Sequence, residues 1–178
     1  MNNGPILIAF GSNIAPERHL VDGLTRLHAV TGWQAISTVY RTKAIPVPGG
    51  PDTHDPDFFN GAVLLDGGWE PLELRVLLKT IERATGRHPD APRWAPRSLD
   101  LDIALMGDRV VRSADLTLPD PDILTRPFLA VTLAQLLPEW RHPEERVTLE
   151  VIAARFAPRQ REMIAEPGIT ARLRAIAA

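Results

Sequence analysis

The sequence predicts an α+β fold of the ferredoxin-like type, with helices packed on a mainly antiparallel sheet. Two observations favour it. The expected elements follow the order strand, helix, strand, strand, helix, strand, and two helices between four strands suit one helical layer on a sheet. Hydrophobic residues make up 44% of the 178 residues, enough for a core, and we find no internal repeat.

The first strand and helix come from residues 6–32. Residues 6–10 form a short apolar run that stops at Gly11, which is typical of a buried strand. Pro16 suits the first turn of a helix, and we expect that helix to end near Gly32. Its apolar face would carry the leucines at helical spacing, Leu20, Leu24 and Leu27.

The next two strands flank a loop. Residues 35–42 are rich in β-branched residues and alternate in polarity, so they predict one strand with Ile36, Thr38 and Tyr40 on the same face. Residues 46–57 hold Pro, Gly and Asp and predict a loop. Residues 58–65 predict the third strand.

The second helix should run from Pro71 to Gly86. Residues 87–98 form a loop with three prolines and four basic groups, counting His88. Residues 99–106 predict the fourth strand, followed by a turn and a short return at 109–111.

The remainder predicts a proline-rich and aspartate-rich loop at 118–127 and a helix at 128–137. Residues 148–178 predict one or two amphipathic helices, broken near Pro158 and Pro167. We therefore expect one domain, with 1–147 as its main body and 148–178 as a C-terminal helical extension.

Composition excludes several classes of protein. The formal net charge is −2, which gives no support for a nucleic-acid binder. The chain has no Cys, so disulfides and thiolate metal sites are excluded, and a reducing compartment fits. We find no secretory signal or membrane span and expect a cytoplasmic protein.

Residues 93–103 carry the strongest chemical signal. Alternate side chains of a strand share a face, so Asp100 and Asp102 would project together, roughly 6–7 Å apart along the chain. Hard oxygen ligands select Mg²⁺ or Mn²⁺, and two such ions clamp displacements at phosphorus. Arginine forks bind phosphate, which favours a metal–triphosphate substrate. The arginines are Arg87, Arg93 and Arg97. The alternative is a solvated strand face beside a basic surface loop.

Two further patterns are weaker. Gly11-Ser12-Asn13 is a glycine-led turn that can approach a phosphate or ring closely, although an ordinary turn explains it equally well. Phe58 and Asn60 would share a strand face, as a stacking ring beside an amide that binds a heterocycle. Phe128 could supply a second stacking ring. For both Phe58 and Phe128 the alternative is packing in the hydrophobic core.

These residues resemble the 6-hydroxymethyl-7,8-dihydropterin pyrophosphokinase family from about Ile6 to Trp140. The most specific segment is 93–103, which reads R-W-x-P-R-[ST]-L-D-L-D-I, supported by Gly11-Ser12-Asn13, Tyr40-Arg41-Thr42 and 58–62. The resemblance implies a single ferredoxin-like domain. It also implies transfer of pyrophosphate from ATP to the pterin hydroxymethyl group, giving the pterin diphosphate and AMP in folate biosynthesis.

The resemblance also implies roles for individual residues. Asp100 and Asp102 would hold two Mg²⁺ ions and, with Arg87 and Arg97, form the catalytic set. ATP contacts would come from Arg93, Trp94, Arg97, Ile103, Asp120 and Arg126. Pterin contacts would come from Thr42, Ile45, Phe58, Asn60, Trp94 and Phe128. Glu82 matches a position that is usually acidic in the family.

Some positions depart from the family pattern. Asp120 stands where the family often has His, and Pro89 where some members carry Arg. The loop at 46–57 is longer than in compact members, and the chain beyond Val147 has no counterpart that we can assign.

We expect an in-line attack of the hydroxymethyl oxygen on the β-phosphorus of ATP, with loop 87–98 as a lid that excludes water. The enzyme would be a monomer that binds small molecules and neither nucleic acid nor membrane. Two alternatives remain. One is a non-catalytic or altered-specificity pterin or nucleotide binder, which Asp120 favours. The other is an interaction module for an acidic partner or RNA.

Overall fold

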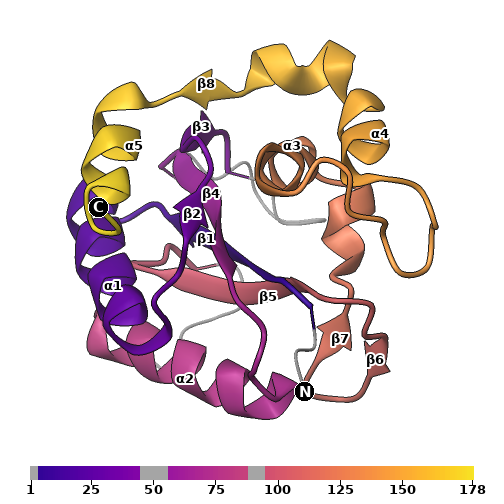
Figure 1. Cartoon of the computed structure of the whole chain (residues 1–178). Coiled ribbons are helices and arrows are strands. Elements are labelled where there is room, and N and C mark those ends of the chain that lie inside the picture. The colour runs from indigo at the N-terminus through magenta and orange to yellow at the C-terminus, as the bar shows by residue number, and fades with distance from the viewer. Residues whose placement is uncertain (1–3, 45–55, 88–94) are drawn as a thin grey trace.

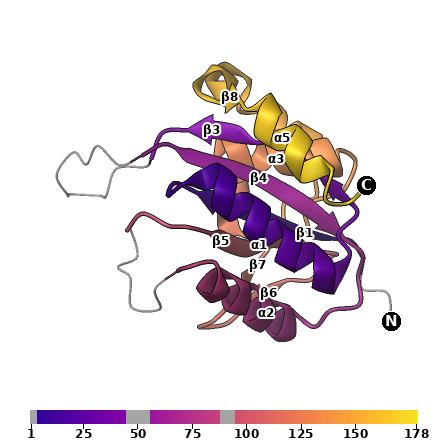
Figure 2. The ribbon, with the colours of Figure 1, turned by 90° about the vertical axis from the view of Figure 1, so that its left-hand side faces the viewer.

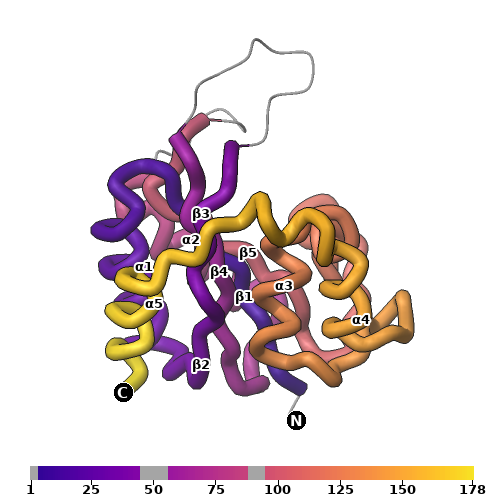
Figure 3. Tube along the Cα trace, turned by 90° about the horizontal axis from the view of Figure 1, so that it is seen from above, coloured from indigo at the N-terminus to yellow at the C-terminus, as the bar shows by residue number. Residues whose placement is uncertain are grey.

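The computed structural model describes residues 4–44, 56–87 and 95–178. A six-stranded sheet lies between two layers of helices (Figures 1 and 3). Its main strands are β1 (Ile6–Ser12), β2 (Ala35–Ile36), β3 (Tyr40–Thr42), β4 (Phe58–Leu65), β5 (Asp100–Met106) and β8 (Ile164–Ala165). The order is β5-β1-β4-β3-β8, with β2 also on β4, and every pair is antiparallel. This order confirms the ferredoxin-like prediction.

One face of the sheet carries α1 (Pro16–Thr31), α2 (Pro71–Ala84) and α5 (Pro167–Arg174), which lie together in Figure 2. The other face carries α3 (Pro127–Leu136) and α4 (Leu149–Ala154), as Figure 3 shows. No helix in the described part of the chain is both long and apolar enough to cross a membrane.

Proline and glycine set the ends of α1 as the sequence predicts. Pro16 is its first residue, where the missing N–H costs no helical hydrogen bond. Gly32 ends the helix in the left-handed region, at φ 58°, and its N–H donates to His28 O at 2.8 Å. The turn at Gly32 ends α1, and the chain returns to the sheet at β2.

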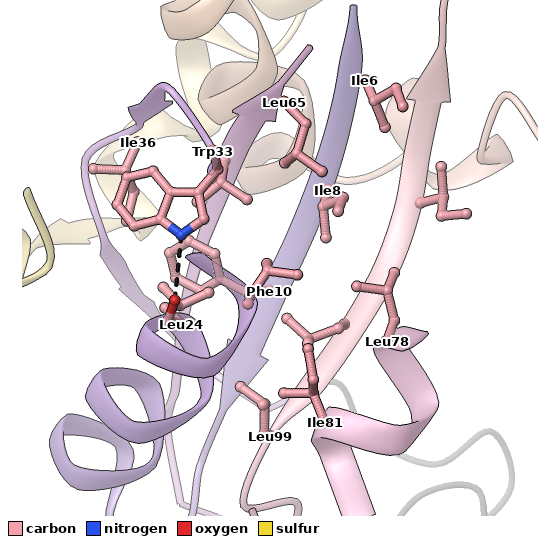
Figure 4. Packing of buried hydrophobic residues seen from close by; sticks show 14 of the residues in the cluster. Ile6, Ile8, Phe10, Leu24, Trp33, Ile36, Leu65, Leu78, Ile81 and Leu99 are labelled. Atoms are coloured by element: carbon pink, nitrogen blue, oxygen red, sulfur yellow. Dashed lines mark hydrogen bonds between the residues drawn. The ribbon is translucent and has the colours of Figure 1, made fainter. Parts of the chain in front are cut away.

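Two core clusters cover the two faces of the sheet. The first lies under α1, α2 and α5 and includes Ile6, Ile8, Phe10, Leu24, Trp33, Leu78, Ile81 and Leu99 (Figure 4). Trp33 is 1% exposed, and its Nε1 donates to Leu24 O at 3.3 Å, which satisfies a buried donor. The second lies under α3 and α4 and includes Leu7, Leu105, Leu129, Leu133 and Ile152. Residues 6–10 of β1 are all apolar because the strand packs against a core cluster on each of its faces.

The single strand expected at 35–42 is wrong, because the chain breaks between β2 and β3. Ser37 N donates to Ala62 O at 3.0 Å, while Ser37 Oγ accepts from Ala62 N at 2.9 Å. Thr38 N donates instead to Gln135 Oε1 of α3 at 2.9 Å. The backbone N–H groups of Ser37 and Thr38 are therefore satisfied by residues distant in sequence. The alternation of polar and apolar residues at 35–42 does not reveal these partners.

The chain after β5 also differs from expectation. The short return expected at 109–111 is β6 (Val111–Arg112), which pairs with β7 (Thr117–Leu118) and not with β5. A 3₁₀ turn, η1 (Pro121–Leu124), precedes α3. The C-terminal extension is helical in α4 and α5, but it also contains a 3₁₀ segment, η2 (Ala157–Glu162), and contributes strand β8 to the sheet.

Candidate active site

A pocket opens where β1, β3, β4 and β5 meet the start of α3. Most of the site residues predicted from the sequence line it. They are Thr42, Phe58, Asn60, Arg97, Asp100, Asp102, Asp120, Arg126 and Phe128. Ile103 lines a second hollow that shares Asp102 and Asp120 with the first. Arg87 reaches the pocket through its contact with Asp100. Ile45, Arg93 and Trp94 lie outside the described residues, as do Pro89 and most of the loop at 46–57.

The alternation of β5 directs its two aspartates to one face. Leu101, between them, is 0% exposed and belongs to the first core cluster. The Asp100 carboxylate contacts the guanidinium groups of Arg87 and Arg97. Burial acts to raise the pKa of Asp100, but the attraction of Arg97 and Arg87 outweighs it and lowers that pKa. The Asp100 carboxyl is therefore charged at neutral pH.

Asp102 is more open than Asp100. Its side chain is 53% exposed, and its Oδ1 lies 3.1 Å from Lys79 Nζ. The sequence analysis missed Lys79, which lies on α2 and also donates to Leu101 O at 3.0 Å. Burial acts to lower the pKa of Lys79, but Asp102 and Glu82 outweigh it and raise that pKa. A fixed cation thus stands beside the outer aspartate.

Glu82 connects α2 to β5. Its side chain is 2% exposed, and its oxygens accept from Lys79 Nζ, Arg87 and Leu101 N, each at 2.7 Å. Burial raises the pKa of Glu82 against the opposing attraction of Lys79. This acid holds two cations and the strand backbone between the aspartates. The spacing of Lys79 and Glu82, three residues apart on a helix, is the sequence signal that could have revealed the pair.

The aspartates suit a magnesium site by their chemistry. Mg²⁺ prefers oxygen ligands and usually takes one or two carboxylates, with the rest supplied by water and substrate phosphates. Asp100 and Asp102 offer two carboxylates on one wall of the pocket. Within the described ranges no group of three or more His, Cys, Asp or Glu residues could hold a metal. A pair of carboxylates fits an ion whose other ligands are water and substrate phosphates.

The opposite wall is built on β4 and β3. Asn60 is 6% exposed, and its Nδ2 donates to Thr42 Oγ1 at 2.8 Å. Gly11 faces this amide, since a Cβ there would lie 2.9 Å from Asn60 Oδ1 and 3.7 Å from Phe58. Phe58 lines the pocket, whereas Phe59 packs against the first core cluster. Phe128 lines the pocket and also packs against the second cluster.

The turn after β1 anchors the backbone of Arg97. Asn13 Oδ1 accepts from Arg97 N at 2.6 Å. The backbone N–H groups of Asn13 and Ile14 donate to Arg97 O at 3.1 and 3.2 Å. The amide of Asn13 thus fixes the residue that contacts Asp100, a role that the sequence analysis did not assign.

Asp120 stands between the two hollows. Its Oδ1 accepts from Asp122 N at 2.8 Å, and its own N–H donates to Ala104 O at 2.9 Å. Burial, with smaller effects of Asp122 and Asp102, raises the pKa of Asp120 to about 6. Arg126 pairs with Asp122 at 2.6 Å on the same rim.

The chain matches a family model described as 7,8-dihydro-6-hydroxymethylpterin-pyrophosphokinase over residues 7–138. It is 36% identical to a 2-amino-4-hydroxy-6-hydroxymethyldihydropteridine pyrophosphokinase of Synechocystis, over 80% of this chain and 71% of the relative. It is 37% identical to a protein of the same description from Pseudomonas aeruginosa, over 84% of this chain and 90% of the relative.

Among solved structures, the fold is similar to a Plasmodium falciparum HPPK-DHPS triple mutant with pteroate, at a TM-score of 0.67 and 13% identity. The match covers 89% of this chain and 44% of that one, so this chain spans under half the length of that structure. At this identity the likeness supports the fold alone.

Proposed function

The chain belongs to the 7,8-dihydro-6-hydroxymethylpterin-pyrophosphokinase family, and we propose that the pocket between β4 and β5 is its active site. The protein is an enzyme of folate synthesis that transfers pyrophosphate to the pterin, with ATP as co-substrate. The departure at Asp120 was the reason to consider a non-catalytic pterin or nucleotide binder, and membership of this family does not favour that alternative. The observation that carries the assignment to this pocket is that Asp100 and Asp102 line it together with the Asn60–Thr42 pair, with Gly11 of β1 between Asp100 and Asn60 in the sheet.

Asp100 and Asp102 would hold two Mg²⁺ ions between them and the ATP phosphates. When bound, magnesium neutralises phosphate charge and lowers the pKa of an attacking alcohol. Support comes from the lowered pKa of Asp100, which keeps that ligand ionised, and from the exposure of Asp102. Both carboxylates already attract cations.

Arg87 and Arg97 would bind phosphate oxygens beside these ions. Guanidinium groups bind such oxygens in a bidentate manner, and both arginines already meet at Asp100. The anchored backbone of Arg97 supports a fixed position for its charge. The ATP contacts expected from Arg93 and Trp94 remain predictions.

Asn60 and Thr42 would bind the edge of the pterin, and Phe58 and Phe128 would stack on its ring. Within the described residues the nearly buried Asn60 side chain bonds to Thr42 through its Nδ2, and this supports the role because the amide also has an acceptor oxygen that can serve a heterocycle. Ile45 and Trp94 stay predictions on the same side.

The rest of ATP would extend from Asp102 into the second hollow, beside Ile103 and Asp120. Arg126, on the shared rim, would attract a phosphate. Asp120 is an acid where the family often has His, and its pKa, raised to about 6, makes it easier to protonate beside a polyphosphate than an ordinary carboxyl.

In the reaction, the pterin hydroxymethyl oxygen would attack the β-phosphorus of ATP in line. A bond forms from that oxygen to the β-phosphorus, the bond to the bridging oxygen of the α-phosphate breaks, and AMP leaves with the electron pair. Protein residues contribute mainly by positioning and by charge. The alcohol proton passes to a pocket carboxylate or to water.

We further propose that residues 1–147 and 148–178 form one domain and that the enzyme acts as a monomer in the cytoplasm. The pairing of β8 with β3 and the burial of Ile169 and Leu173 in the first core cluster support one domain.

The test is release of AMP from ATP and Mg²⁺, with and without 6-hydroxymethyl-7,8-dihydropterin. AMP should form only when the pterin is present. Tight pterin binding without AMP formation would select the non-catalytic alternative, and AMP formation without the pterin would contradict the proposed acceptor.

A further inference from the structure

Both backbone polar groups of Val39 are bound by the C-terminal segment. Val39 N donates to Thr170 Oγ1 at 2.9 Å, across 131 positions of sequence. Val39 O accepts from Glu166 N at 2.9 Å. Val39 is 0% exposed and lies in the break between β2 and β3, so without these partners its backbone would be buried and unsatisfied.

The same segment continues along β3. Tyr40 pairs with Ala165 and Arg41 with Ile164. Arg41 Nε also donates to Glu166 Oε1 at 2.7 Å. Thr170, which is 4% exposed, donates its own hydroxyl back to Glu166 O at 2.7 Å and so closes the arrangement. Strand β3 is thus held on one side by β4 and on the other by residues 164–170.

The break decides which side chains of β3 face the pocket. Beyond it, Tyr40 packs against the second core cluster, Arg41 turns to Glu166, and Thr42 lines the pocket beside Asn60. Side chains of a strand alternate, so a slip of one residue would move Thr42 to the other face.

We infer that residues 164–166 and Thr170 position the pterin-binding wall. Thr170 and Glu166 are positioning residues: they fix Val39 and the register of β3, and thereby hold Thr42 against Asn60. Neither lines the described part of the pocket, so both act through β3. The inference rests on the proposed function in one respect, the assignment of Asn60 and Thr42 to the pterin.

Thr170→Val tests the inference, because valine keeps the shape and removes the acceptor for Val39 N. We expect the KM for 6-hydroxymethyl-7,8-dihydropterin to rise about tenfold, as one lost hydrogen bond of typical strength allows. The KM for ATP and kcat should change less than about twofold, because Asp100 and Asp102 stand on the other wall. The Val39 amide should exchange its hydrogen faster, and Thr170→Ser should restore both values.

Arg172→Gln is the matched control. Arg172 lies on the same helix and pairs with Glu17 at 2.8 Å, with 54% of its side chain exposed, and it does not touch Val39. It should leave both KM values and the Val39 exchange rate unchanged. Should Thr170→Val fail to fold, Glu166→Gln replaces it, since that variant weakens the link to Arg41 of β3. A rise in the pterin KM at an unchanged ATP KM supports the inference, and an unchanged pterin KM overturns it.

Two results separate the inference from the proposed function. Faster Val39 exchange with an unchanged pterin KM would overturn the inference and leave the function standing. A wild-type protein without AMP release would overturn the function instead. In that case the inference is overturned as well if Thr170→Val leaves Val39 exchange unchanged.

Discussion

The ammonium group of Lys79 lies 2.7 Å from Oε1 of Glu82, an acid that is 2% exposed. The same ammonium lies 3.1 Å from Asp102, so one cation links a buried acid of α2 to the outer acid of the pocket. The charge at Asp102 is therefore coupled to the stability of the helix–strand contact behind it.

Lys79→Met should destabilise the protein by about 2–4 kcal/mol at pH 7, because it removes a partner of a buried charge. Urea denaturation measures this. The loss should shrink as pH falls, since the pKa of Glu82 is raised and its neutral form needs no cation. Lys43→Met is the control: Lys43 is 87% exposed beside Asp57, and less than about 1 kcal/mol should be lost. Equal losses in the two variants would contradict the buried linkage.

Asp102→Ala should reduce turnover at least about a hundredfold, since the loss of one transition-state contact has an effect of that order. The fold should stay intact, and the exposed pair with Lys79 should cost less than about 1 kcal/mol of stability. The side chain is 53% exposed and supports no core contact. Single-turnover AMP formation is the measurement. Asp22→Ala, on the exposed face of α1, removes the same charge and should keep full activity. Near-normal turnover in Asp102→Ala would exclude the metal role.

Gly11→Ala should raise the pterin KM about tenfold, because displacements of about 1 Å in a site cost on the order of a hundredfold. Its Cβ would lie 2.9 Å from Asn60 Oδ1, so the amide must shift by a few tenths of an ångström. Gly168→Ala is the control, since no atom lies within 4 Å of a Cβ there. Unchanged pterin kinetics in Gly11→Ala would argue against Asn60 as a ligand.

Asp120→Asn should stabilise the protein at pH 8 and not near pH 4. Burial raises the pKa of Asp120 from 3.8 to about 6, so the folded state binds the proton more tightly than the unfolded state. Stability contributed by this carboxyl therefore falls as pH rises from 3.8 to 6. The variant removes that penalty, about 1–3 kcal/mol above pH 6, and its amide oxygen can still accept from Asp122 N.

Urea denaturation at several pH values measures the effect of Asp120→Asn. Asp115→Asn, at an exposed position, makes the same change of charge and should show no such trend. A stability difference that stays constant from pH 4 to pH 8 would refute a buried, proton-binding Asp120.

Local signals predicted the elements that carry the pocket. Pro16 and Gly32 delimit α1 and Pro71 begins α2, because these residues act through their own backbone angles. The strand period placed Asp100 and Asp102 on one face. Each of these predictions needs only neighbours along the chain.

Features that depend on partners distant in sequence could not be predicted from the sequence. The break at 37–39 depends on Gln135 and Thr170, which lie about a hundred residues or more along the chain. Asn13 acquires its role only because the turn after β1 meets Arg97. Strand β8 is two residues long and has no alternation to detect.

Strand β8 also protects the sheet from unwanted assembly. An uncovered edge strand offers a row of free N–H and C=O groups, which templates the addition of further chains. Here β8 occupies the edge of β3, and with only two residues it offers little edge of its own. A chain cut before Ile164 is therefore expected to aggregate through β3, even where its remaining core still folds.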